Sequence, residues 1–140
     1  MNPSTSSQNV RFRRAFWKNY AEVHPETPKA IQFLEGFGNA NPQYRIKEAD
    51  LHIKQWLGSV TVGVYVQAKH DDSHAAVQDR INLYWPRFKE KFEDITYSEG
   101  RSWFVSSLRC EGGTRNFWNW DEAATWLEER RKQYEELLSR

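Results

Sequence analysis

Three polar side chains in the middle of the sequence have the types and spacing of a metal-dependent phosphodiesterase. Gln67 and Lys69 stand two residues apart at the end of a run of alternating valines, and Asp50 lies in the preceding alternating run. A divalent cation held by oxygen ligands polarises a phosphate, and a neighbouring lysine can position or activate the attacking water. The three residues form a candidate catalytic set, with Glu48 as a further candidate ligand.

The same residue types are also typical of the solvent-facing side of a two-layer protein. Asp, Glu, Gln and Lys line the wet face of many half-buried antiparallel sheets. A cross-strand pair such as Glu48 with Lys69 is an ordinary stabiliser, contributing about 0.2–1 kcal/mol. A glutamine is also a poorer ligand for a hard cation than a carboxylate. Which interpretation applies depends on how the strands that carry these side chains are paired.

Two alternating runs, residues 44–57 and 60–68, predict the β-hairpin that would position the candidate set. Gly58 and Ser59 between them have the chemistry of a two-residue turn. One face of this hairpin is apolar, and the residues expected to point inward are Leu51, Ile53, Leu57, Val60, Val62, Val64, Val66 and Ala68.

The expected turn also fixes which residues face one another. If Leu57 faces Val60, then Asp50 lies directly opposite Gln67. Lys69 follows two residues later on the same face of the hairpin. This register brings the three candidate catalytic residues together without any further assumption.

Helical spacing of apolar residues predicts the elements around the hairpin. We expect helices over residues 9–23, 28–36, 74–95 and 120–138, and a third strand over residues 101–110. Ser73 and the two aspartates before it are suited to cap the third helix, and Pro86 should kink that helix or begin its second half. Residues 115–120 are expected to form a short fourth strand or a structured loop, and residues 1–8 a disordered tail.

The last helix has its own start signal and two expected faces. Asn119 is expected to cap it, with Glu122 as the capping-box partner. The residues expected on its inner face are Ala123, Leu127, Tyr134 and Leu138. The pairs expected on its outer face, each four residues apart, are Glu128–Lys132, Arg131–Glu135 and Lys132–Glu136.

The order of elements is α-α-β-β-α-β-(β)-α, which predicts an α+β fold. We expect a small, mostly antiparallel sheet, made of a β-hairpin plus one or two further strands, packed on one face by helices. A single domain over residues 9–140 suits a chain of 140 residues. Aromatic residues make up 15% of the chain, including seven Trp, which indicates a core built from large rings. Stacking on the bases of a single-stranded nucleic acid is the alternative use of such rings.

Composition excludes several classes of protein. The net charge of +1 excludes a globally basic nucleic-acid binder, so any such contact must come from a local patch. Cys110 is the only cysteine, so it cannot form an internal disulfide, and its strand-like setting indicates a buried, inert thiol. No apolar run reaches membrane-spanning length and no secretory signal is present. We therefore expect a cytoplasmic protein with no membrane partner and no cofactor.

The first helix offers a local basic patch. Its cations, which lie beside Phe16 and Trp17, are Arg11, Arg13, Arg14 and Lys18. Clustered cations contact phosphates, and such binding weakens as salt rises. Elsewhere in the chain the patch is continued only by Arg101, Arg109 and Arg115. The alternative is a helix face that is merely solvated.

Two histidines, His70 and His74, lie four residues apart with two aspartates between them. Histidines at this spacing on a helix can share a metal ion. The segment straddles the start of a helix, and capping and solvation explain its residues. We therefore predict no metal site at this position.

The chain as a whole resembles a domain family of unknown function in bacteria and archaea. The segments that carry the resemblance are RRAFWKNY, VTVGVYVQ, INLYWPRFKEKFED, RSWFVSSLRC and WDEAATWLEERRKQYEELL, which together span roughly residues 10–138. Members of that family often form the carboxyl-terminal module of predicted restriction-type nucleases and other defence proteins. The resemblance implies an accessory α+β module that helps a partner engage DNA, and it transfers no catalytic residue.

Three functions follow from these patterns. The first is a stand-alone accessory or binding module whose partner is DNA or a nuclease or defence protein, using the basic helix and the exposed hairpin face. The second is a divalent-metal nuclease of the restriction type with a Gln-x-Lys motif, using Asp50, Gln67 and Lys69. The third is a homodimeric interaction domain that associates through the hairpin edge or an exposed patch around Trp118 and Trp120.

Overall fold

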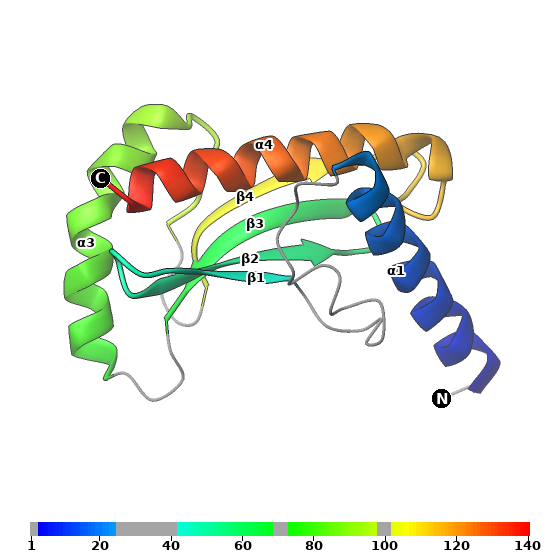
Figure 1. Cartoon of the computed structure of the whole chain (residues 1–140), viewed down its shortest axis with the longest axis horizontal. Helices are drawn as coiled ribbons and strands as arrows, with labels where there is room; N and C mark the ends of the chain where they lie inside the picture. Colours follow the sequence, from blue (N-terminus) through cyan, green and yellow to red (C-terminus); the bar gives the residue numbers. More distant parts are fainter. Residues whose placement is uncertain (1–2, 25–41, 69–72, 98–101) are drawn as a thin grey trace.

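The computed structural model describes residues 3–24, 42–68, 73–97 and 102–140. Its elements in chain order are α1 (Pro3–Val23), β1 (Gln43–Ile46), β2 (Leu51–Leu57), β3 (Thr61–Gln67), α3 (His74–Lys91), β4 (Trp103–Arg109), a 3₁₀ turn (Phe117–Asn119) and α4 (Trp120–Leu138). The four strands form one antiparallel sheet in the order β1-β2-β3-β4, and α4 lies along one face of it (Figure 1). The predicted α+β fold is confirmed.

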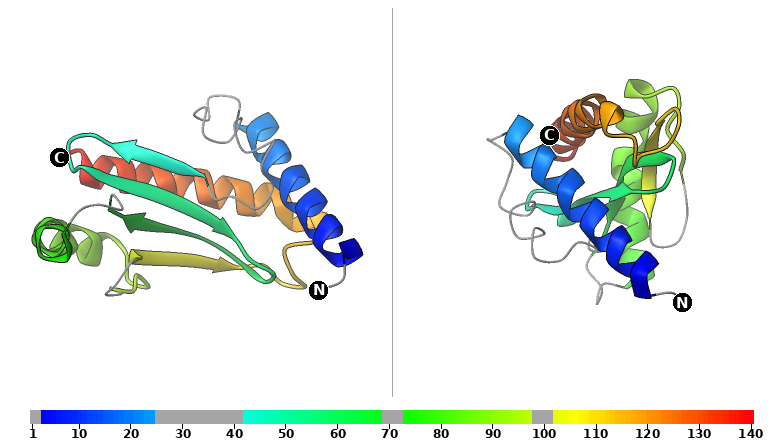
Figure 2. Two further views of the ribbon diagram at one scale, coloured as in Figure 1. Left: turned by 90° about the horizontal axis from the view of Figure 1, so that it is seen from below. Right: turned by 90° about the vertical axis from the view of Figure 1, so that its right-hand side faces the viewer.

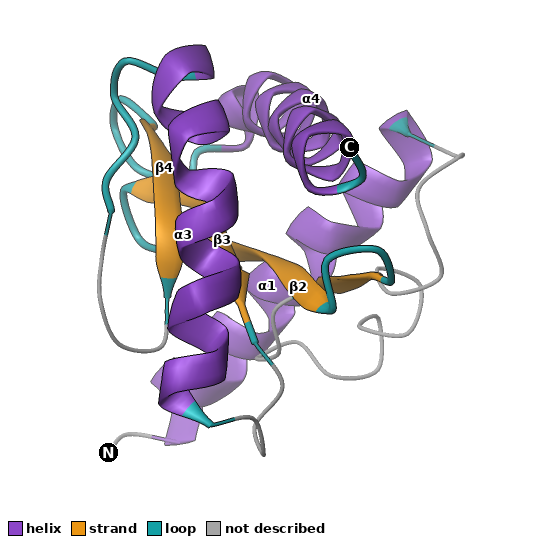
Figure 3. Ribbon diagram, turned by 90° about the vertical axis from the view of Figure 1, so that its left-hand side faces the viewer, coloured by secondary structure: helices purple, strands orange, loops and turns teal. Residues whose placement is uncertain are grey.

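The sheet curves around α4, so that α4 occupies its concave side (Figure 3). A β-bulge contributes to this curvature, because the register of β3 with β4 shifts between Val64 and Val66. Within the bulge Phe104 has a φ of 55°, a left-handed conformation that few residues other than glycine adopt. Both Trp103 and Phe104 are buried as a result. The two faces of β4 therefore do not alternate in burial at the start of the strand.

Large rings fill the space between the sheet, α3 and α4, as the composition predicted. Phe88 of α3 stacks on Phe104 with ring centroids 4.5 Å apart and meets Tyr134 of α4 edge-on at 4.8 Å. Trp85 stacks on the same Phe104 at 5.5 Å. The residues expected on the inner face of α4 are all buried, namely Ala123, Leu127, Tyr134 and Leu138.

Two helices stand at the two ends of the strands (Figure 1). Near the hairpin tip, α1 begins at Pro3 rather than at the expected Asn9 and therefore includes residues 3–8. At the other end, α3 is capped as predicted, since the Ser73 hydroxyl accepts a hydrogen bond from the Ala76 N–H at 3.3 Å. Pro86 lies inside α3, which continues to Lys91. The helix expected over 28–36 falls outside the described residues.

The fourth strand is not where the sequence suggested. It is β1, at the start of the run that was expected to be one long strand, and a turn over residues 47–50 separates it from β2. Residues 115–120 contain the 3₁₀ turn instead, so the loop alternative is confirmed. The Asn119 side chain makes no capping hydrogen bond to α4, and the predicted capping box is wrong.

Candidate functional site

The β2–β3 hairpin turns one residue later than predicted. Leu57 pairs with Val62, and the Gly58 N–H donates to the Thr61 carbonyl at 2.8 Å, which leaves Ser59 and Val60 at the tip. Val60 is 44% exposed instead of pointing inward. Each residue of β2 therefore pairs with a residue of β3 two positions later than predicted. Because side chains alternate with a period of two, the inward and outward faces of the remaining residues stay as predicted.

The corrected register does not place Asp50 opposite Gln67. His52, not Asp50, lies opposite Gln67. Asp50 is in the turn before β2 with a φ of 52°, and its carboxylate lies 3.6 Å from the Arg45 guanidinium and 3.9 Å from that of Arg80. The expected pairing of Asp50 with Gln67 is therefore wrong, and Asp50 instead joins the β1–β2 turn to α3.

The remaining metal-site candidates gain no geometric support. Glu48 is exposed in the same turn as Asp50, and His74 is exposed at the start of α3. Lys69 and His70 fall outside the described residues. Across the part of the chain that is described, no group of three or more His, Cys, Asp or Glu side chains could hold a metal ion.

A tryptophan and a glycine explain the observed register. Trp56 pairs with Gly63, and its indole lies directly over that glycine, where an added Cβ would be only 1.9 Å from a ring carbon. The indole N–H also donates to the Thr61 hydroxyl at 3.4 Å, and the Tyr65 ring centroid is 6.0 Å away. The glycine within a run of valines was the feature of the sequence that could have predicted this contact, because a large ring on the partner strand can fill the space above a glycine.

The convex face of the sheet carries aromatic and cationic side chains. No described helix lies across it, and it faces the viewer in the left view of Figure 2. Its outward positions are Gln43, Arg45, His52, Lys54, Trp56, Thr61, Gly63, Tyr65, Gln67, Ser107 and Arg109. The four strands contain no Asp or Glu. The face is therefore positive while the chain as a whole is almost neutral.

The basic residues of α1 divide into two groups. The Arg13 guanidinium donates to the Leu57 carbonyl at 2.6 Å, and its half-buried position lowers the pKa of Arg13. It therefore fastens α1 to the hairpin. Arg11, Arg14 and Lys18 are exposed, but the expected aromatic partners Phe16 and Trp17 are buried in the core. Base stacking on those two rings is excluded.

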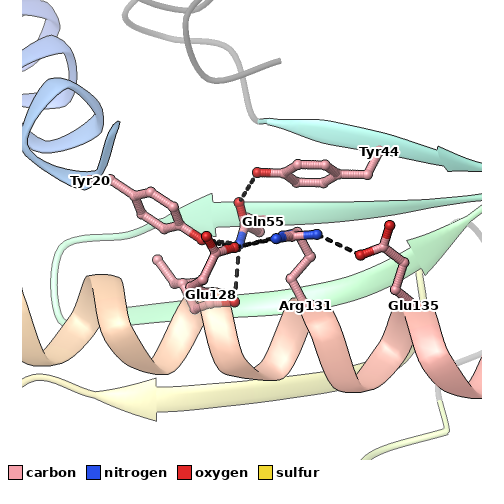
Figure 4. A network of polar contacts seen from close by, with 7 residues as sticks. Tyr20, Tyr44, Gln55, Glu128, Arg131 and Glu135 are labelled. Atoms are coloured by element: carbon pink, nitrogen blue, oxygen red, sulfur yellow. Dashed lines mark hydrogen bonds and ion pairs between the residues drawn. The ribbon is translucent and has the colours of Figure 1, made fainter. Parts of the chain in front are cut away.

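A buried polar network lies between α1, β1, β2 and α4, and the sequence did not predict it (Figure 4). The Gln55 amide donates to the Tyr20 hydroxyl at 3.0 Å and to the Leu127 carbonyl at 3.1 Å, and its oxygen accepts from Tyr44 at 3.1 Å. A glutamine at an inward position between apolar residues was the available signal, because a buried amide requires partners.

An ion pair completes this network. The Arg131 Nε donates to Glu128 at 2.9 Å, and its Nη1 donates to Glu135 at 2.6 Å. Glu128 and Arg131 are 2% and 4% exposed, so their expected place on the outer face of α4 is wrong, although the expected ion pair between Arg131 and Glu135 is present. Burial lowers the pKa of Arg131, but hydrogen bonding to Glu128 and the charges of Glu128, Tyr44 and Glu135 together more than offset this, and the net shift is upward.

The network has the character of a structural element. Burial raises the pKa of both Tyr20 and Tyr44 well above the ordinary range, so the two phenols stay protonated. The Gln55 and Glu128 side chains are almost fully buried. Cys110 is also buried, as predicted, and burial raises the pKa of its thiol. These groups lie in the core rather than at a surface that a substrate could reach.

None of the described helices combines the length and the apolar content that crossing a membrane requires. The resemblance to a defence-associated domain family rests on framework residues alone and stays a prediction. Comparison of the chain with protein-family models, with curated proteins and with solved structures finds no match in any of the three.

Proposed function

We propose that this protein is a binding module for single-stranded nucleic acid and that the convex face of its sheet is the binding surface. The observation that carries the proposal is the pairing of two neighbouring rings, Trp56 and Tyr65, with a set of cations and no carboxylate on the strands. Unpaired bases stack on exposed aromatic rings for about 1–3 kcal/mol each, and cations on the same surface bind the phosphates.

The side chains of this face divide into three chemical roles. Trp56 and Tyr65 supply the stacking surface near the middle of the sheet. Lys54 pairs across the strands with Tyr65, so a phosphate next to a base stacked on that ring would lie close to the ammonium group. At the margins, Arg109 is exposed and can contact the phosphate backbone, and Arg45 is exposed but also lies 3.6 Å from the Asp50 carboxylate.

The face favours single strands over duplexes. In a duplex the bases are stacked on one another and present only their edges, so a broad sheet face cannot reach their planes. Unpaired bases can splay out and lie on the rings. His52 and Gln67, opposite each other in the sheet, add an imidazole and an amide that can hydrogen-bond to base edges.

The nuclease alternative has less support. Its carboxylate, Asp50, already lies near two arginines, and its expected glutamine partner faces His52. We therefore place nucleic-acid contact on the sheet face without proposing cleavage.

Fluorescence anisotropy with labelled single-stranded DNA and RNA tests the proposal. We expect binding that weakens as salt rises from about 50 to 200 mM, because displaced counterions drive phosphate contact. Tyr65→Ala should weaken binding by about 1–3 kcal/mol, while Tyr65→Phe retains the stacking ring. Lys54→Ala should reduce the salt slope by about one unit. Absence of binding to either polymer at low salt would refute the proposal.

Lys89→Ala is the matched control for Lys54→Ala, because Lys89 is exposed on α3 and away from the sheet face. Equal loss of affinity in both lysine variants would mean that the sheet face is not the site. Arg13→Ala is unsuitable as a binding variant, since Arg13 holds α1 to the hairpin and its removal would disturb the fold.

A further inference from the structure

The loop between β4 and α4 presents two adjacent aromatic side chains to solvent. Phe117 and Trp118 are each 74% exposed. They lie at the end of α4 where the hairpin tip also lies (Figure 1). Large rings exposed side by side are uncommon on a monomer and mark interaction surfaces.

Hydrogen bonds fix this loop in place. The Asn119 amide donates to the carbonyls of Glu111 and Gly113, each at 2.9 Å, and the Trp120 indole donates to the Thr114 carbonyl at 2.8 Å. The Thr114 N–H in turn donates to Ser59 at the hairpin tip at 2.9 Å. The two rings are thus held outward by an ordered loop, so little conformational entropy is lost when a partner binds them.

The protrusion also carries a positive charge. Arg115 lies over the Phe12 ring at 4.8 Å, and the Phe117 and Trp120 rings are 6.0 Å apart. We call Arg115, Phe117 and Trp118 the aromatic protrusion.

A depression of the opposite charge lies beside it, over the first half of α4. Its lining, which we call the acidic depression, is Leu108, Asp121, Glu122, Thr125, Trp126 and Glu129. The lining combines three carboxylates with two apolar side chains, Leu108 and Trp126. Such a site suits an aromatic side chain accompanied by an arginine, and it repels a phosphate backbone.

We infer that the chain forms a two-fold dimer in which the aromatic protrusion of each copy occupies the acidic depression of the other. Both surfaces lie at the same end of α4, so a two-fold axis between them makes the contact twice and closes the assembly. Each copy supplies the apolar rings, the arginine and the carboxylates that the other copy needs. A second copy is therefore an occupant that supplies both the aromatic rings and the complementary charge.

Sedimentation equilibrium over a wide range of protein concentration tests this inference. We expect a monomer–dimer equilibrium whose dissociation constant rises roughly tenfold or more in a Phe117→Ser/Trp118→Ser variant. Leu83→Ser is the matched control, because Leu83 is 73% exposed on α3, outside both surfaces. A wild-type chain that is monomeric at every concentration, or equal weakening by the control, would overturn the inference.

A charge-exchange experiment distinguishes this specific contact from non-specific association. Arg115→Glu alone and Glu122→Lys/Glu129→Lys alone should each weaken self-association. A mixture of the two variants should restore dimers, because both contacts of the mixed dimer then pair opposite charges. Asp121 is left unchanged, since it accepts a hydrogen bond from Asn19 within the chain. Failure of the mixture to associate better than either variant would overturn the inference, whether or not the sheet face binds nucleic acid.

Discussion

At the scale of single residues, the Glu128–Arg131 ion pair places two charges in a core that is otherwise mainly apolar. The two side chains are only 2% and 5% exposed. Removing two charges from water is costly, and the pair persists because each charge has several partners. Glu128 accepts from Arg131 and, at 3.4 Å, from Tyr20, while the guanidinium lies 4.7 Å from the Tyr44 ring centroid.

Glu128→Gln should therefore be strongly destabilising. The substitution keeps the shape of the side chain but leaves the buried Arg131 charge with only the partly exposed Glu135 as a carboxylate partner, which costs at most about 3–5 kcal/mol. The double variant Glu128→Leu/Arg131→Met removes both charges and should recover most of that loss. Urea denaturation of both variants, with Glu90→Gln at an exposed position of α3 as the control, measures the difference. A double variant as unstable as the single one would show that the pair itself stabilises the fold.

The sequence could not place Glu128 because its neighbours give a misleading signal. Glu128 and Lys132 have the spacing of a surface pair, and such pairs normally mark a solvent face. However, α4 is contacted by α1, α3, β2 and β3, so more than one stripe of this helix is buried. A rule based on a single inward stripe assigns the wrong side to a polar residue in a helix that is surrounded on several sides.

At the scale of elements, β2, β3 and β4 were predicted, but the fourth strand and the register of the hairpin were not. Alternating residues identified β2 and β3, and their valines are buried as expected. The turn chemistry of Gly58-Ser59 suggested a reversal one residue too early. The pairing of the Trp56 indole with Gly63 fixes the actual register, and this is a contact across strands that local turn preferences do not contain. The candidate catalytic set depended on that register.

The loop after β4 shows the same limit for a helix start. Asn119 has the residue type of a helix cap, but its side chain closes the loop by donating to two carbonyls. The Asn119 amide can donate to these carbonyls because of where residues 111–113 lie. The backbone path of that segment is set by Gly112 and Gly113, which have φ angles of 80° and 100°.

Asn119→Asp distinguishes the two roles of this residue by the sign of its effect. As a helix cap, an aspartate would be equal to asparagine and would favour the helix dipole. As the loop-closing residue it would place a carboxylate against two carbonyl oxygens and lose both donated bonds, so we expect a loss of about 1–3 kcal/mol. Thermal unfolding of Asn119→Asp and Asn119→Ala checks this. An aspartate variant at least as stable as the wild type would contradict the loop-closing role.

At the scale of the whole molecule, one curved sheet separates a packed aromatic core from a cationic surface. Its concave side holds α4 (Figure 2, right view, and Figure 3). The aromatic core lies on that side, and the outward positions of the strands carry Arg45, Lys54 and Arg109. Composition predicted a core of large rings, and this is confirmed by Phe16, Trp17, Phe88 and Phe104, all at most 1% exposed. Composition could not predict which face of the sheet would lack carboxylates, because that depends on how the strands pair.

The tyrosines of that core should make the whole fold sensitive to alkali. Burial raises the pKa of Tyr20, Tyr44 and Tyr134 above the ordinary value of 10.0. Below about pH 10 these phenols are protonated in the folded and unfolded chains alike, so their contribution to stability is fully present. Above it the unfolded chain releases protons that the native state retains, and unfolding becomes more favourable as pH rises.

Each such tyrosine lowers the free energy of unfolding by about 1.4 kcal/mol per pH unit above pH 10, which gives about 4 kcal/mol per unit for the three together. Urea denaturation at intervals from about pH 8 to pH 11 measures this slope, and Tyr20→Phe should reduce it by about a third. General repulsion between surface charges would give a slope that falls in high salt, because added ions screen exposed groups far more than buried ones. A slope that persists in salt but is absent below pH 10 therefore identifies the buried phenols as its source, and a flat profile up to pH 11 would contradict their assignment as protonated core residues.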